Sequence, residues 1–117
     1  MAYLIETAGK RWLFPGDTRI YDARLLPDMG SVDSLFAHLW LGRGEALQTP
    51  PPLLKPFCQF CLDLQPDQII LTHLEELGRD ADDFWDASHV KLVQQQFEKQ
   101  RASIPILPVY MGDRVCL

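Results

Sequence analysis

The chain has 117 residues, a formal net charge of −5 and a hydrophobic fraction of 47%. This length and composition fit a single globular domain, residues 1–117, and argue against a disordered chain. No apolar run approaches the ~20 residues of a membrane helix, and Lys and Arg are scattered, so neither a membrane nor a nucleic-acid backbone is an expected partner.

The first half of the chain contains three predicted strands. Residues 3–7 and 11–14 are short apolar runs on either side of a glycine-containing turn, which is typical of a β-hairpin. Residues 18–32 are polar and rich in turn-forming residues, so we expect irregular structure there. A third, almost continuously apolar strand is predicted over residues 34–41, and Gly42-Arg43-Gly44 ends it.

The second half alternates between helix and strand. The prolines at 50–52 introduce a predicted helix that runs to about Leu64, because proline is tolerated in a first helical turn. Residues 67–74 form a buried-strand candidate, and Asp82 or Asp83 is expected to cap a long amphipathic helix. Residues 104–117 predict a last strand pair or a bent strand.

This element order predicts an α/β fold with a mixed sheet. The two helical crossovers should be right-handed, so both helices lie on one face if the strand order advances in one direction. The other face would then leave large apolar side chains exposed to solvent. Each exposed side chain forgoes roughly 1.5–3 kcal/mol of stabilisation from burial. The sequence therefore predicts either a strand order that reverses midway or a second chain that covers the sheet.

Four stretches of the sequence, in order and across almost the whole chain, resemble a known family. They read IETAGKRWLFPGDT, DSLFAHLWLGRG, IILTHLEELGRDADDFW and PVYMGDRVCL. They look like the C-terminal half of a metallo-β-lactamase-fold hydrolase. The resemblance implies half of an αββα sandwich with its helices mainly on one face, and a site for one or two zinc ions at the sheet edge between the two halves.

The resemblance assigns two metal ligands, Asp17 of the Gly-Asp motif and His73 at the end of a strand. The His-x-His-x-Asp-His cluster and a further histidine of the family's N-terminal half have no counterpart here. A catalytic zinc usually takes three protein ligands and one open position, so two ligands form an incomplete site. Without a ligand role, Asp17 is a common turn residue. Arg79 is expected to pair with Asp17 or with a neighbouring carboxylate.

Other chemically capable side chains are expected to have structural roles. His38 lies inside an apolar strand and is expected in the core or an interface, and His89, one helical turn after an aromatic residue, is expected at the surface or in packing. Cys58 and Cys61 form a C-x-x-C pair one turn apart on an apolar helix face, which favours buried small side chains over a redox pair. The odd number of cysteines, together with an N-terminus unlike a signal peptide, predicts reduced thiols in the cytoplasm.

Three functional hypotheses follow. In the first, a truncated or split metallo-β-lactamase-like protein has no complete active site and pairs its bare sheet face with another chain, in a homodimer or with a complementary N-terminal half. In the second, a partner chain or second copy completes the site of a metal-dependent hydrolase. In the third, a small α/β interaction domain binds no metal. The isolated chain is expected to be inactive.

Overall fold

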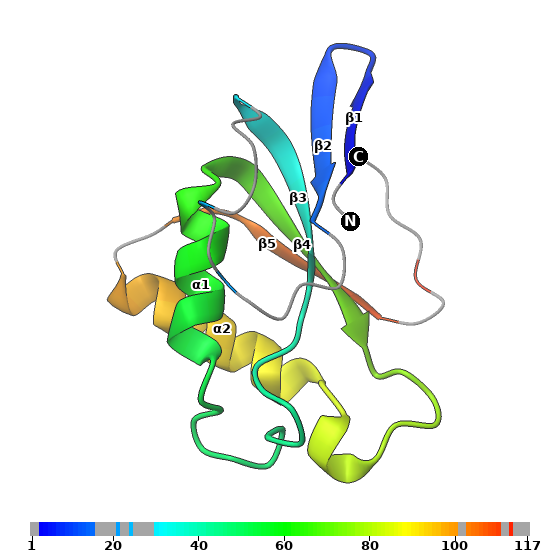
Figure 1. Ribbon diagram of the computed structural model, residues 1–117, viewed down its shortest axis with the longest axis vertical. Coiled ribbons are helices and arrows are strands. Elements are labelled where there is room, and N and C mark those ends of the chain that lie inside the picture. The colour runs from blue at the N-terminus through cyan, green and yellow to red at the C-terminus, as the bar shows by residue number, and fades with distance from the viewer. Residues whose placement is uncertain are drawn as a thin grey trace.

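One mixed sheet with two helices organises the computed structural model, which describes residues 3–15, 21, 24, 30–100, 103–110 and 113 (Figure 1). This confirms the predicted α/β class. The strands are β1 (Tyr3–Thr7), β2 (Lys10–Phe14), β3 (Val32–His38), β4 (Pro66–Leu74) and β5 (Ile106–Tyr110), and the helices are α1 (Leu54–Asp63) and α2 (Ala87–Lys99), with a 3₁₀ turn at Ala81–Asp83.

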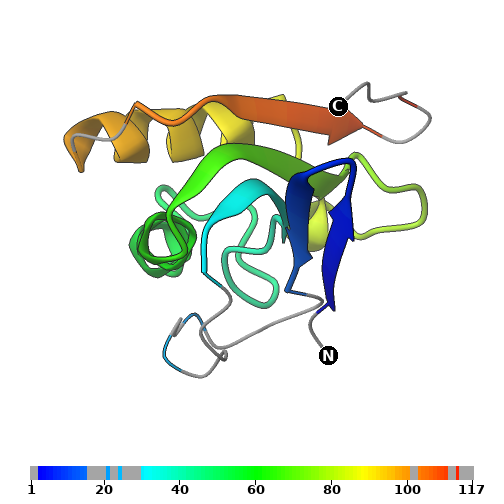
Figure 2. The ribbon, with the colours of Figure 1, turned by 90° about the horizontal axis from the view of Figure 1, so that it is seen from above.

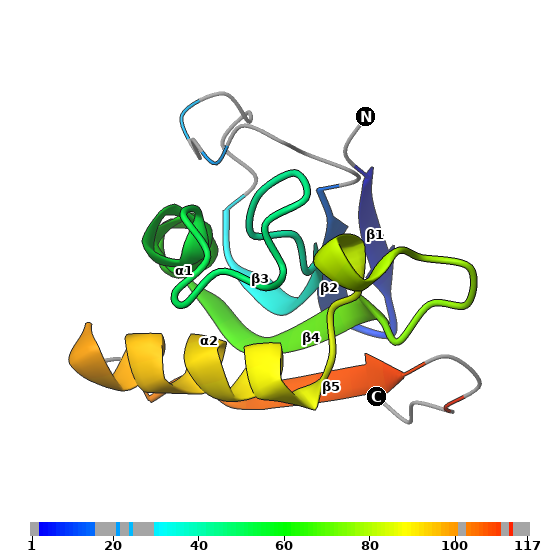
Figure 3. The same cartoon turned by 90° about the horizontal axis from the view of Figure 1, so that it is seen from below.

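The strand order across the sheet is β1-β2-β3-β4-β5, the same as the order along the chain. Strands β1 and β2 form the predicted antiparallel hairpin, and β2 to β5 are mutually parallel. Because the order never reverses in the described sheet, right-handed crossovers bring both helices to one face. They contact each other, and Figures 2 and 3 show them on the same side of the strands.

The main hydrophobic core lies between the sheet and the helices. Alternate residues of neighbouring strands point to the same face, and Leu35 and Leu71 belong to the cluster that also contains the apolar side chains of α1 and α2. The helical members are Leu54, Phe57, Cys58, Phe60, Cys61, Val90, Val93 and Phe97. This face is closed by elements of the chain itself.

No helix of the described chain covers the opposite sheet face. Phe36 stacks there on Phe14, with ring centroids 4.2 Å apart. The register places Ile5 beside Trp12, and Ile5 is 45% exposed. At the other edge of the sheet, Leu107 pairs with Ile70 and is 43% exposed, whereas Ile70 in the interior strand β4 is fully buried. Of the two alternatives that the sequence left open, a strand order that reverses midway is therefore excluded for the described sheet, and this face has no helix of the described residues above it.

Helix α2 begins later than predicted. Its N-cap is Asp86, whose carboxylate accepts a hydrogen bond from the Ser88 N–H, while the Asp86 N–H donates to Nδ1 of His89. The expected caps, Asp82 and Asp83, instead belong to the separate 3₁₀ turn, because the backbone at Phe84 is extended and interrupts the helical path. The prediction of Asp82 or Asp83 as the cap was therefore wrong.

Strand β3 also ends earlier than the apolar pattern suggested. β3 ends at His38, although Leu39 and Leu41 are fully buried. The loop containing Leu41 folds back, and its carbonyl accepts a hydrogen bond from the Leu53 N–H. Continuous apolar sequence indicates burial, and here burial continues beyond the sheet pairing. Of residues 104–117, for which a last strand pair or a bent strand was predicted, the structure describes 104–110 and 113, and these include β5; the rest of the prediction lies outside the described residues.

Candidate metal site

Two histidines meet at one edge of the sheet. β3 and β4 are parallel, so their carboxyl ends lie at the same edge, and His38 is the last residue of β3. His73 is the penultimate residue of β4. The third position predicted from the resemblance, Asp17, follows β2 in sequence and lies outside the described residues.

The imidazole rings of His38 and His73 are stacked face to face. Their centroids are 3.4 Å apart and their planes differ by 4°. Strand alternation by itself would send His73 to the helix face with Leu71, and His38 to the opposite face with Phe36. A register shift in β4 between Leu71 and Leu74 removes this conflict, because such a bulge redirects a side chain.

The backbone at His73 is part of that irregularity. Its φ is +64°, in the left-handed region that non-glycine residues seldom occupy. Such a conformation costs on the order of 1–3 kcal/mol and is found preferentially at functional sites. The folded chain thus holds this imidazole in place against a local energetic cost.

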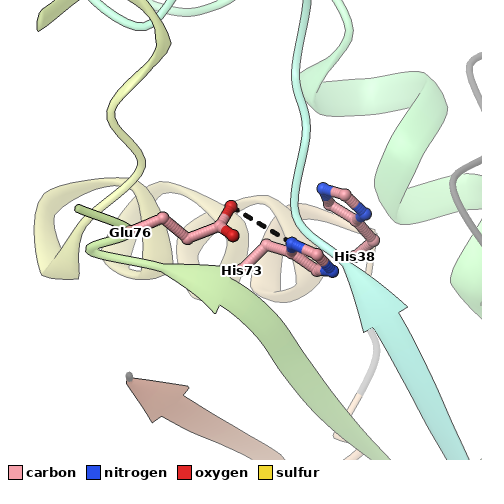
Figure 4. A group of neighbouring side chains, drawn as sticks. All are labelled: His38, His73 and Glu76. Carbon is pink, nitrogen blue, oxygen red and sulfur yellow. Dashed lines mark hydrogen bonds and ion pairs between the residues drawn. The ribbon is translucent and has the colours of Figure 1, made fainter. Parts of the chain in front are cut away.

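Glu76 completes a cluster of three potential ligands (Figure 4). Nδ1 of His73 lies 3.1 Å from Oε1 of Glu76. One ligand atom from each of His38, His73 and Glu76 lies within 4.8 Å of the others. The side chains of His73 and Glu76 are 41% and 26% exposed, so solvent reaches the cluster.

This donor set fits zinc better than calcium or magnesium. Two imidazoles and one carboxylate are a known set for a zinc site that keeps one position open, whereas calcium and magnesium prefer oxygen ligands. The lone pairs of stacked rings point along parallel planes. Binding of a single ion by both histidines therefore requires one ring to rotate out of the stack and the Glu76 carboxylate to exchange its hydrogen bond for a metal bond.

Arg79 forms an ion pair with the Glu76 carboxylate of the cluster. Its Nη2 donates to Oε1 of Glu76 at 3.2 Å, and its Nη1 donates to Oδ2 of Asp83 at 2.9 Å. The hydrogen bond to Asp83 and the charge of Glu76 raise the pKa of Arg79 above its usual value. This confirms the predicted pairing of Arg79 with neighbouring carboxylates. The alternative partner, Asp17, is outside the described chain.

A pocket of about 570 Å³ opens beside the cluster. Its lining comes from the chain just after β3 and from the segment that leads to α2, and it consists of His38, Trp40, Arg43, Gly44, Glu76, Arg79, Asp82, Asp83 and Trp85. Two hydrogen bonds hold its walls together. The Ala46 N–H donates to the Asp82 carbonyl at 2.8 Å, and Nε2 of the buried His89 lies 2.7 Å from the Ala46 carbonyl.

The sequence analysis singled out one member of this cluster. His73 was a predicted ligand, whereas His38 was assigned to packing and Glu76 was not considered as a ligand. The signal that identifies His38 is its position, because the carboxyl ends of adjacent parallel strands share one sheet edge. Glu76 has no comparable sequence signal, since acidic residues are common after a strand. His89, expected at the surface or in packing, is a buried packing residue.

No protein-family model matches this chain, and no curated protein matches it. No helix in the described part of the chain is both long and apolar enough to cross a membrane.

Proposed function

We propose that this chain binds a zinc ion through His38, His73 and Glu76. The observation that carries the proposal is the convergence of two strand-end histidines and one carboxylate at an accessible sheet edge. The bulge and the left-handed backbone at His73 support it, because they turn this ring toward His38 at an energetic cost. Zinc bound by such a set supplies Lewis-acid chemistry for hydrolysis.

The fold is proposed to correspond to one half of a metallo-β-lactamase-like sandwich. The sequence resemblance supports this, as does the presence of both helices on one sheet face. The same resemblance suggests Asp17 as a further metal ligand. β2 is parallel to β3 and therefore ends at the same sheet edge as His38, and Asp17 comes three residues after Phe14 at the end of β2. The proposed single-chain site remains incomplete compared with the family's ligand set.

A second chain is proposed to complete the structure by packing on the helix-free sheet face. His38 follows Ser34 and Phe36 at alternate positions of β3, so it lies at the end of this helix-free face. A partner that buries Phe36 therefore comes close to the metal cluster. That partner is a second copy or a complementary N-terminal half, and the complete assembly is proposed to be a cytoplasmic metal-dependent hydrolase. An isolated chain would then lack hydrolytic activity.

Zinc content after removal by chelator, reloading and desalting tests the metal site. We expect one zinc per chain in the wild type, and loss of binding in His38→Gln, His73→Asn and Glu76→Gln. Asparagine suits position 73 because it tolerates a positive φ. Glu98→Gln is the matched control, since Glu98 is an exposed carboxylate on α2 and should leave zinc content unchanged. Asp17→Asn tests the additional ligand that the resemblance suggests.

The outcomes separate the functional hypotheses. Zinc that is retained by the wild type and lost in the three cluster variants supports the site. A folded wild-type chain that retains no zinc contradicts it and favours the small α/β interaction domain. Hydrolysis of an ester or phosphodiester by the zinc-loaded assembly, lost in Glu76→Gln and retained in Glu98→Gln, would establish the hydrolase.

Association is the second candidate function, and the exposed apolar side chains of the helix-free face favour it. Tyr3 is 58% exposed, and Ile5 and Leu107 are also largely accessible. Tyr3 and Ile5 lie on β1 and Leu107 lies on β5, at the two edges of the sheet, and exposed apolar surface commonly marks protein interaction sites. Light scattering at micromolar concentration checks this candidate, with a particle larger than one chain expected. A well-folded monomer under these conditions contradicts association through a second copy.

A further inference from the structure

The pocket beside the metal cluster has the size and composition of a small-molecule site. Its volume of about 570 Å³ lies within the roughly 300–1,000 Å³ typical of ligand pockets. Its lining combines aromatic surface from Trp40 and Trp85 with arginines and carboxylates. We propose, on the basis of the zinc site proposed above, that this pocket binds a small oxyanion carrying a flat aromatic group, of the aryl phosphate class.

The charges that face the pocket favour an anion once zinc is bound. Arg79 forms ion pairs with Glu76 and Asp83, and these three groups together carry one negative charge. The two positive charges of a zinc ion at the cluster more than balance that charge. The remaining charges, Arg43 and Asp82, are of opposite sign. The loaded pocket therefore carries a net positive charge, concentrated at the zinc end.

Arg43 is the cation available for direct recognition. Its side chain is exposed, and no hydrogen bond or ion pair joins it to another residue in the part of the chain that the structure describes. A guanidinium binds the oxygens of phosphate or carboxylate in a bidentate manner, and zinc attracts the same oxygens. An oxyanion in the pocket can thus bind zinc and Arg43 together.

The two tryptophans favour a flat apolar substituent on that anion. Trp85 lines the pocket, is buried, and packs edge-on against His89, with centroids 4.9 Å apart. Trp40 is half-buried, and its ring lies against that of Tyr21, with centroids 6.4 Å apart. Both indoles therefore pack against other rings of the fold, and rigid aromatic walls bind a flat ring at low entropic cost.

Titration with phenylphosphonate, followed by tryptophan fluorescence, tests the inference without any need for turnover. We expect saturable binding to the zinc-loaded chain, tighter than binding of inorganic phosphate, which lacks the ring. Arg43→Gln should weaken binding about tenfold. Asp82→Asn should tighten it by about threefold because it removes an opposing charge. Lys91→Gln, an exposed position on α2 outside the pocket, is the matched control and should change nothing.

The opposite signs expected for Arg43→Gln and Asp82→Asn distinguish recognition from structural damage, which would weaken binding in both. If zinc binds stoichiometrically and phenylphosphonate affinity is equal in wild type and Arg43→Gln, this inference is overturned and the metal proposal stands. If the chain binds no zinc, the metal proposal fails. Phenylphosphonate binding that still depends on Arg43 would then support the pocket, and no binding would overturn it.

Discussion

The two faces of the sheet differ in whether helices of this chain cover them. On β3, Leu35 and Ala37 point toward the helices and are 0% and 2% exposed, whereas the intervening Phe36 is only partly buried. The first face packs against α1 and α2, and the second carries aromatic side chains with no described helix above them. The His38–His73–Glu76 cluster lies at the end of the second face. We therefore expect folding of the single chain to depend mainly on the first face, and the proposed metal binding and association to depend on the second.

The largest contrast should come from paired truncations on the two faces. Phe57 of α1 is 1% exposed and packs edge-on against Tyr21, with centroids 5.3 Å apart. Phe57→Ala should lower the free energy of unfolding by about 3–5 kcal/mol, whereas Phe36→Ala should cost about half as much because Phe36 is less buried. Urea unfolding measures both. Equal losses would show that the second face is as well packed as the first.

The helix face should also lose stability at alkaline pH. Burial raises the pKa of Cys58 to about 12, and burial together with the charge of Cys58 raises the pKa of Cys61. The unfolded thiols titrate near the ordinary value of ~8.5. The folded pKa values are higher than the unfolded ones, so the buried protonated thiols contribute fully to the free energy of unfolding below pH ~8.5. This contribution is lost as the pH rises toward the folded pKa values, by about 1.4 kcal/mol per pH unit for each thiol.

The free energy of unfolding, measured at a series of pH values from neutral to alkaline, should fall as the pH rises. Cys58→Ala should show a shallower slope than the wild type, because one of the two buried thiols is removed. The comparison concerns the slopes, so the cavity that alanine leaves does not affect it. Identical slopes in the two proteins would contradict thiol burial as the cause.

The sequence predicted the features of this fold that depend on local spacing and missed those that depend on tertiary arrangement. Periodicity found the β1–β2 hairpin, α1 and the buried side of β4, because these depend on local spacing and burial. It overextended β3 past His38, because the burial of Leu39 and Leu41 by a loop leaves the same apolar pattern as a strand. The pairing of His38 with His73 was missed, since it depends on strand order and on a bulge with no separate sequence signal.

The cluster edge should show a conflict between stability and function at His73. Glycine there removes the penalty of a positive φ, so His73→Gly should be as stable as the wild type or more stable by about 0.5–1 kcal/mol, despite the lost hydrogen bond to Glu76. His38→Gly, in regular strand geometry, should lose about 1 kcal/mol. Both should lose zinc. A strongly destabilised His73→Gly variant would show that the left-handed backbone there carries no strain.

A smaller effect is expected at the N-cap of α2, which supports the helix face. Asp86→Ala removes the hydrogen bond from the Ser88 N–H and should lower the free energy of unfolding by about 1 kcal/mol. Partial burial opposes the shift, but hydrogen bonds from Ser88 lower the pKa of Asp86, so this contribution is lost as the pH falls below the ordinary value for aspartate. Thermal unfolding beside Asp67→Ala, an exposed position in β4, measures the difference. Equal stability of the two variants would contradict the cap.

Substitutions on the helix-free face should have the smallest effect on stability. They should nevertheless have a large effect on association, and this separates the roles of the two faces. Ile5→Lys and Leu107→Lys alter side chains that are 45% and 43% exposed, so each should change the free energy of unfolding by no more than about 0.5 kcal/mol. Sedimentation should nevertheless show that both variants lose association, because a lysine charge would be buried in the interface. Leu77→Lys is the control, since Leu77 is 83% exposed in the loop after β4. If all three variants associate as the wild type does, the helix-free face is not the interface. If only the two sheet variants dissociate, the helix-free face is the surface used for assembly, although it contributes little to folding.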